Sequence, residues 1–249
     1  MKQKRIVLFS LVFIIAILAI TACSSKQQKV LTRTEFLMDT VITLKIYDSK
    51  DEKIMDKAIN RLKEIEDRMS ATIDNSDVSL INQNAGIKPV KVNDDTYFVI
   101  EKAKHFAKLS NGAYEPTIGP LVELWNITGT DERERESIPT EEEINEKKAL
   151  VNYKDLILEE GNSVYLSKKG MKLDLGGIVK GYAADEVKRI FLENDVNSAI
   201  IDLGGNIYAL GEKTNGEAWK IGIQDPFTVA GNYIGILNTK DSSIVTSGD

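Results

Sequence analysis

The residues best suited to bind a ligand lie in one stretch, Leu173–Asp185, with the sequence LDLGGIVKGYAAD. Its pattern predicts a strand, a turn made by Gly176 and Gly177, and then the start of a helix. Glycines let the backbone approach a ligand closely, and the first turn of a helix offers free N–H groups to an anion. Lys180 adds a full positive charge on that turn. The stretch therefore predicts a phosphate-binding site.

The same stretch has a plainer interpretation, in which a left-handed turn joins a strand to a helix. Lys180 is then a solvated side chain, and Asp174 caps the turn. The glycines have neither the Walker spacing nor the GxGxxG spacing. The sequence therefore supports neither a P-loop nucleotide hydrolase nor a Rossmann dinucleotide-binding enzyme.

Composition excludes several other kinds of site. The sequence contains one cysteine, Cys23, and one histidine, His105. An intramolecular disulfide and a zinc site with several Cys and His ligands are thus excluded, whereas carboxylates and carbonyls suffice for a hard cation such as Mg²⁺. The 32 basic residues against 38 acidic ones give a net charge of -6, which disfavours nucleic acid as a partner.

The N-terminus has the pattern of a secretion signal. A basic start, MKQKR, precedes an apolar run over residues 6–20, which is shorter than the roughly 18 to 20 residues of a membrane-spanning helix. The next residues end in Cys23 and resemble the bacterial lipobox, in which the cysteine is acylated and becomes the mature N-terminus. We predict a lipoprotein signal peptide over residues 1–22 and a lipid on Cys23. A plain signal peptide and an uncleaved helical anchor are the alternatives.

All three alternatives place the domain on the extracytoplasmic side, and lipid on Cys23 would hold it at the cell membrane. Without residues 1–22, the chain has 29 basic and 38 acidic residues, a net charge of -9. Such a domain needs a lipid rather than its charge to stay at an anionic membrane. We predict a polar tether over residues 23–34 and one domain over residues 35–249.

The elements that must position these residues divide the chain into two unlike halves. Helices are predicted over residues 51–69 and 94–109 after a strand over 41–47, and residues 113–125 are predicted to form a loop. A charged run over 130–148 is expected to be solvent-exposed, with Thr140 and Glu143 as the capping box of a short helix. Strands are predicted over 164–167, 171–175, 198–203, 207–210, 219–223 and 233–237, with one helix over 178–194. A helix-rich half followed by a strand-rich half indicates an α+β fold.

Several segments, taken in order, resemble one protein family. Residues 173–185 closely resemble the signature of the ApbE family, the FAD:protein FMN transferases. The resemblance covers Thr34–Asp249 and implies the ApbE-like flavin transferase fold. Its other segments are 36–40 (FLMDT), 69–82, 112–121 (GAYEPTIGPL), 202–211 (DLGGNIYALG) and 246–249 (TSGD).

The resemblance also implies which residues bind the flavin and the metal, but it assigns no catalytic residue. The backbone carbonyl of Gly177 would be a magnesium ligand. For Met38 and Tyr114, ordinary core packing is the alternative. The residues implied in FAD binding are Met38, Thr72, Ala113, Tyr114, Glu115, Asp174 and Lys180.

The sequence departs from the family pattern at three places. Thr72 stands where the family commonly has a tyrosine, which removes an aromatic surface for the flavin ring. Glu115 replaces an aspartate and is one methylene longer. The family continues past the SGD segment with a His, and then an Asp and a Thr that complete the magnesium site. We therefore expect the sequence, which stops at Asp249, to be truncated.

The family's activity implies a reaction at the diphosphate of FAD. A Thr or Ser hydroxyl of an acceptor flavoprotein would attack the phosphorus on the FMN side and release AMP. Lys180 and Mg²⁺ would neutralise the diphosphate. The implied acceptor is a respiratory subunit of the sodium-pumping Nqr or the Rnf type. The alternatives are a magnesium-dependent FAD pyrophosphatase, in which water is the attacking group, and a lipoprotein that binds FAD or another solute without catalysis.

Overall fold

A five-stranded antiparallel sheet forms the centre of the computed structural model, which describes residues 30–127, 138–229 and 231–246. The predicted signal peptide and Cys23 lie outside the described residues. The sheet confirms the strands predicted near residues 41–47, 198–203 and 207–210. In spatial order its strands are β1 (Leu31–Leu37), β2 (Thr40–Ile46), β6 (Ser198–Leu203), β7 (Asn206–Gly211) and β10 (Ser242–Val245).

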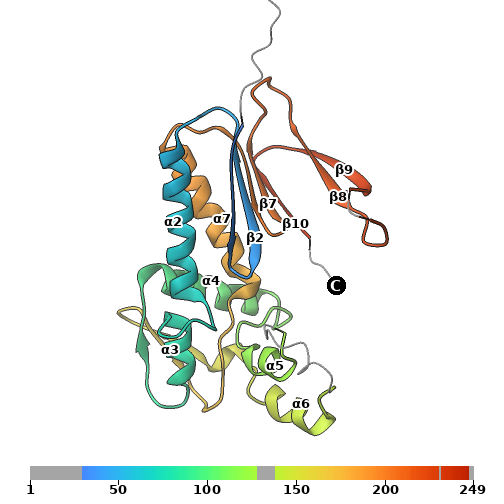
Figure 1. Ribbon diagram of the computed structural model, residues 1–249. Coiled ribbons are helices and arrows are strands. Elements are labelled where there is room, and N and C mark those ends of the chain that lie inside the picture. Colours follow the sequence, from blue (N-terminus) through green and yellow to red (C-terminus); the bar gives the residue numbers. More distant parts are fainter. Residues whose placement is uncertain (1–29, 128–137, 230, 247–249) are drawn as a thin grey trace, which may run out of the picture.

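Two long helices, α2 (Glu52–Met69) and α7 (Gly176–Glu193), pack against one face of this sheet (Figure 1). Ile42, Leu44 and Ile46 alternate along β2 and are fully buried against them. Helix α2 begins where the Asp51 side chain accepts a hydrogen bond from the Lys53 N–H. No helix in the described part of the chain is long and apolar enough to cross a membrane.

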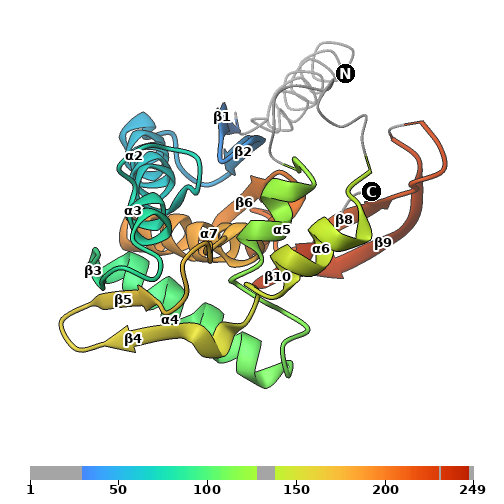
Figure 2. The ribbon, with the colours of Figure 1, turned by 90° about the horizontal axis from the view of Figure 1, so that it is seen from below.

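Smaller elements lie beyond one end of the sheet or stand off from it (Figures 1 and 2). The capping box of Thr140 and Glu143 is present at the start of α6, as predicted. The further helices are α3 (Asp77–Gln83), α4 (Asp94–Leu109), α5 (Gly119–Leu124), α6 (Glu141–Lys148) and the 3-10 helix η2 (Tyr153–Asp155). A three-stranded sheet consists of β3 (Val90–Lys91), β5 (Ser163–Leu166) and β4 (Leu156–Glu159). A separate two-stranded sheet consists of β8 (Trp219–Gln224) and β9 (Tyr233–Thr239).

Several predicted boundaries are wrong. Residues 31–34 belong to β1 rather than to a tether, and α5 interrupts the loop predicted over 113–125. The strand predicted over 171–175 is missing, because only an isolated bridge joins Lys172 to Ile118. Gly176 and Gly177 form no turn, since they are the first two residues of α7.

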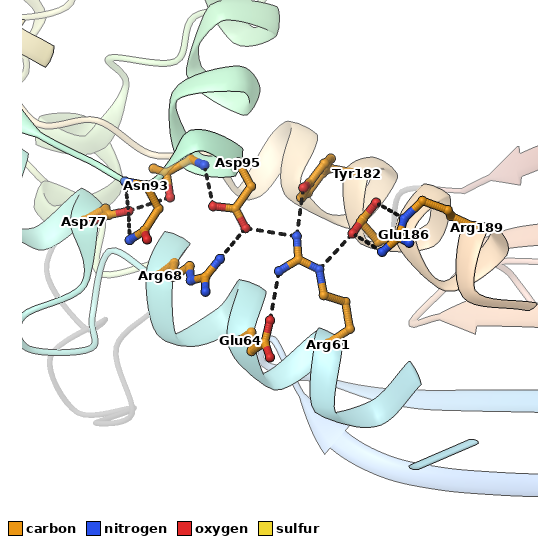
Figure 3. A network of polar contacts seen from close by, with 10 residues as sticks. Arg61, Glu64, Arg68, Asp77, Asn93, Asp95, Tyr182, Glu186 and Arg189 are labelled. Atoms are coloured by element: carbon orange, nitrogen blue, oxygen red, sulfur yellow. Dashed lines mark hydrogen bonds and ion pairs between the residues drawn. The ribbon is translucent and has the colours of Figure 1, made fainter. Parts of the chain in front are cut away.

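Arg61 of α2 joins three helices in a polar network (Figure 3). Its guanidinium pairs with Asp95 of α4 at 2.9 Å and with Glu186 of α7 at 2.8 Å. It also donates to the hydroxyl of Tyr182 on α7, and Arg68 of α2 pairs with Asp95 at 2.7 Å. The network ties the start of α4 and the middle of α7 to one face of α2.

Candidate active site

A cavity of about 930 Å³ lies where the end of α2, the β1–β2 turn, α3, α5 and the start of α7 meet. Figure 2 shows α3 and α5 on opposite sides of α7. The volume falls within the roughly 300 to 1,000 Å³ of small-molecule sites. Four of the residues predicted from the sequence line this cavity, although they come from three separate segments: Met38, Thr72, and the pair Asp174 and Lys180.

The start of α7 makes one wall of the cavity and favours an anion. Gly176 and Lys180 both line the cavity, and the first turn of α7 contains no acidic residue. No carboxylate in the described ranges pairs with the Lys180 ammonium, whereas Lys172 of the same cavity is paired with Glu123 at 2.6 Å. A helix N-terminus and an unpaired lysine together suit a phosphate group.

Asp174 stands two residues before the first residue of this helix and has one carboxylate oxygen without a partner among the described residues. Its Oδ1 accepts a hydrogen bond from the Gly176 N–H at 2.7 Å. Its backbone N–H donates to the Pro116 carbonyl at 2.8 Å, which fixes the residue against the segment before α5. Oδ2 makes no hydrogen bond to any residue that the structure describes. A carboxylate oxygen in this position can accept from a ligand hydroxyl, such as one on a ribose.

The β1–β2 turn brings Met38 and Asp39 to the cavity in an unusual conformation. Both residues have positive φ angles, 54° and 56°, as a two-residue turn of the I′ type requires. The Met38 N–H donates to Glu66 Oε1 on α2 at 2.6 Å. Left-handed residues other than glycine cost about 1 kcal/mol or more and gather at functional sites. The strand register and Glu66 hold this conformation in place.

Thr72 lies in a loop that the side chain of Ser70 organises. Ser70 Oγ accepts from the backbone N–H groups of Thr72 at 3.1 Å and Ile73 at 3.2 Å. The Ser76 hydroxyl donates to the Ser70 carbonyl at 2.6 Å and closes the loop. The loop presents Thr72 to the cavity with a small hydroxyl side chain.

The ledge residues Ala113, Tyr114 and Glu115 do not line this cavity. The Glu115 carboxylate accepts hydrogen bonds from Thr117 N–H, Thr117 Oγ1 and Tyr153 N–H at 2.7 to 2.9 Å. Tyr114 lies behind the start of α7, where a Cβ on Gly177 would come within 3.0 Å of its ring. These residues support the wall from outside the cavity, and their contact with FAD stays a prediction.

The Tyr114 hydroxyl is buried with no hydrogen-bond partner in the described structure. Burial, followed by the charges of Asp174 and Glu115, raises the pKa of this hydroxyl to about 12. An unsatisfied buried hydroxyl costs about 1 to 3 kcal/mol. We therefore expect Tyr114→Phe to raise the free energy of unfolding by about 1 kcal/mol, measured by urea denaturation at neutral pH.

Tyr182→Phe is the matched control, because the Tyr182 hydroxyl accepts a hydrogen bond from Arg61 at 2.9 Å. Its removal should lower the free energy of unfolding by about 1 kcal/mol. Equal destabilisation by the two variants would mean that the Tyr114 hydroxyl has a partner in solution.

The described residues do not complete a magnesium site. Among them, no three Asp, Glu, His or Cys side chains come together in a way that could hold a metal ion. Gly176 lines the cavity but Gly177, the ligand implied by the resemblance, does not. Magnesium therefore stays a prediction.

Comparison with known proteins decides the family. Residues 38–249 match the model of the ApbE family. The chain belongs to the ApbE family. It is 37% identical over 221 residues to a Klebsiella pneumoniae protein named FAD:protein FMN transferase, a match of 88% of this chain and 66% of the relative. A Treponema pallidum protein of the same name is 32% identical over 235 residues, or 87% of this chain and 64% of the relative. The chain thus spans slightly less than two thirds of these relatives.

Solved structures of ApbE proteins share the fold. The crystal structure of the Thermotoga maritima ApbE protein matches with a TM-score of 0.81 and 33% identity, covering 89% of this chain and 71% of that one. The flavin transferase ApbE from Vibrio cholerae matches with a TM-score of 0.79 and 28% identity, covering 89% and 72%. These matches confirm the predicted α+β fold of the ApbE type.

Sequence analysis did not single out Glu66 and Asn82, although both line the cavity. Glu66 holds the Met38 turn, and Asn82 bonds to the backbone of Leu173. Asn82 is the last residue of the segment 69–82 that resembles the family, which was a usable signal. Glu66 lies within an ordinary charged helix and gave none.

Proposed function

We propose that this protein transfers FMN from FAD to a Thr or Ser hydroxyl of an acceptor flavoprotein and releases AMP. The main support is the cavity, where the start of α7 and Lys180, which no described carboxylate pairs with, form a wall suited to an anion. Membership of the ApbE family adds the flavin, because the relatives are named FAD:protein FMN transferase.

The residues of the cavity can stabilise charge on the diphosphate and orient the substrate during this reaction. The acceptor oxygen forms a bond to the phosphorus on the FMN side, and the bond from that phosphorus to the bridging oxygen breaks. AMP leaves with that oxygen, and the hydroxyl proton passes to solvent. Lys180 and the α7 N-terminus stabilise the negative charge on the phosphoryl oxygens, while Asp174 Oδ2 orients a hydroxyl of the substrate.

The acceptor and the location belong to the same proposal. The resemblance suggests a respiratory flavoprotein subunit of the Nqr or Rnf type as the acceptor. The signal pattern suggests a lipid on Cys23 and a position on the outer side of the cell membrane. A flavin transferase in that position would modify acceptors whose Thr or Ser faces the same compartment.

The deciding experiment incubates the full-length protein with FAD, Mg²⁺ and a candidate acceptor, followed by mass spectrometry of the acceptor and measurement of AMP. We expect the mass of a bound FMN on the acceptor and an equal amount of AMP. Thr→Ala at the acceptor site should abolish both, and excess EDTA tests the magnesium requirement. FAD binding without AMP release under all conditions would favour a binding lipoprotein without catalysis.

Thr72 favours one alternative, an FAD pyrophosphatase. Thr72 lines the cavity with a side chain smaller than the tyrosine common in the family, which would leave more space for an attacking water. AMP formed at the same rate without acceptor, together with no flavin attached to a supplied acceptor, would establish that activity instead.

Lipid attachment makes a separate prediction. Cys23 is the sole cysteine of the sequence, so Cys23→Ala removes every thiol that could be acylated. We expect metabolic labelling with a radioactive fatty acid to mark the wild-type protein and to fall to background in this variant. Label that persists in Cys23→Ala would contradict the lipoprotein prediction.

A further inference from the structure

The side chain of Asn82 on α3 forms hydrogen bonds with both the backbone N–H and the backbone carbonyl of Leu173, a residue far away in the sequence. Its Nδ2 donates to the Leu173 carbonyl at 3.0 Å, and its Oδ1 accepts from the Leu173 N–H at 2.6 Å. Leu173 is fully buried and belongs to no strand, so these are its only backbone hydrogen bonds within the described ranges. Buried backbone groups without partners are costly. The side-chain amide of Asn82 therefore makes the two backbone hydrogen bonds that a neighbouring strand would make in a sheet.

The backbone that Asn82 holds leads directly into the anion-binding wall. Asp174 follows Leu173, and α7 begins two residues later. On the opposite side, the Gly119 N–H donates to the Lys172 carbonyl, and the Asp174 N–H donates to the Pro116 carbonyl. The segment is thus held between the chain near α5 on one side and α3 on the other. Asn82 and Leu173 both line the cavity between them.

We propose that Asn82 is a positioning residue, which sets Asp174 and the start of α7 relative to α3 and thereby determines the affinity for FAD. This inference rests on the proposed function, because it takes FAD to be the ligand of the cavity. Asn82 need not touch the flavin, since it acts through the backbone of Leu173.

The sharpest variant is Asn82→Asp, which keeps the shape of the side chain. The carboxylate still accepts from the Leu173 N–H but places a second acceptor against the Leu173 carbonyl, with no donor between them. At pH 8 we expect the dissociation constant for FAD, measured by flavin fluorescence, to rise about tenfold or more. Hydrogen exchange of the Leu173 amide should become faster than in the wild type at the same pH.

Lowering the pH supplies a readout that a general loss of stability would not give. The introduced carboxyl is protonated below its pKa, and its O–H can then donate to the Leu173 carbonyl. At each pH, the FAD affinity of Asn82→Asp is divided by the wild-type affinity measured at the same pH. This ratio should rise toward one as the pH is lowered from 8 to 5. The division accounts for the shared charged groups of the cavity, which are Asp39, Glu66, Asp74, Glu123, Lys172, Asp174 and Lys180.

Asn84→Asp is the matched control. Asn84 caps the same helix, but its Nδ2 donates to the Leu80 carbonyl at 2.8 Å, and it does not line the cavity. We expect its FAD affinity to stay within about twofold of the wild type, with no recovery at low pH. If Asn82→Asp does not fold, Asn82→Ala at pH 8 carries the test, with the same expected loss of affinity.

The outcomes separate this inference from the proposed function. A wild-type protein that does not bind FAD overturns the proposed function and, with it, the role of Asn82 in FAD binding. Wild-type binding with unchanged affinity in the Asn82 variants overturns only the inference. Weakened binding of Asn82→Asp that shows no recovery at pH 5 overturns it as well.

Discussion

Lys180→Ala is expected to weaken FAD binding by about 10- to 150-fold, which corresponds to about 1.5 to 3 kcal/mol. The Lys180 ammonium lines the cavity, and no carboxylate of the described residues pairs with it. A contact with phosphate would therefore break no ion pair of the described residues, and charge-assisted hydrogen bonds of this kind are among the strongest in proteins. The measurement is an FAD titration at fixed ionic strength, because salt screens the interaction.

Lys188→Ala controls for the loss of one positive charge on the same helix. Its ammonium lies 4.6 Å from the centre of the Tyr208 ring and does not line the cavity. We expect FAD affinity within about twofold of the wild type for this variant. If the two lysine variants lose the same small amount of affinity, Lys180 is solvated and the phosphate site lies elsewhere.

The elements that sequence analysis predicted well are those whose side chains repeat over many residues. Helix α2 buries Ile54, Ala58 and Leu62 at helical spacing, and this pattern depends on no distant contact. Helix α5 has six residues, too few for such a period to be visible. Long helices are therefore predictable from the sequence, while short ones depend on what surrounds them.

The missing strand at residues 171–175 shows a different limit. Met171, Leu173 and Leu175 are buried as the alternation predicted. Apart from the single bridge between Lys172 and Ile118, the backbone between them pairs with no strand of the described residues. It bonds instead to the Asn82 side chain and the Pro116 carbonyl. An alternation of apolar and polar residues indicates which side chains are buried, but it does not indicate which groups form hydrogen bonds with the backbone N–H and C=O groups.

The candidate site could be predicted only in part for a similar reason. Lys180 and Asp174 belong to a local strand-to-helix pattern that carries a physical argument. Met38 reaches the cavity through a left-handed turn that β1, β2 and Glu66 stabilise, and no local signal predicts it. Its place among the candidate residues came from the family resemblance alone.

Arg61→Ala should lower the free energy of unfolding by about 3 kcal/mol, because it leaves Asp95 and Glu186 partly unpaired between helices. The exposed fractions of these three side chains are 15%, 11% and 16%, so water replaces the guanidinium poorly. In this variant Arg68 still pairs with Asp95, and Arg189 still pairs with Glu186. The expected loss of stability is therefore at the lower end of the range for a broken buried ion pair. Arg33→Ala, whose ion pairs are exposed, should lower the free energy of unfolding much less than Arg61→Ala does.

The pH dependence tests whether charge is the cause of this loss. Burial alone would raise the pKa of Asp95, but hydrogen bonds from Arg61 and Arg68 outweigh it and lower that pKa. The hydrogen bond from Arg189, joined by the one from Arg61, lowers the pKa of Glu186 against its burial. Carboxylates with lowered pKa values stabilise the fold above their unfolded pKa values, about 4, and this stabilisation is lost as the pH falls through the folded values. In urea denaturation the difference between wild type and Arg61→Ala should therefore narrow between pH 7 and pH 3. A difference that stays constant would mean that Arg61 stabilises α2 against α4 and α7 by the packing of its aliphatic stem rather than by its charge.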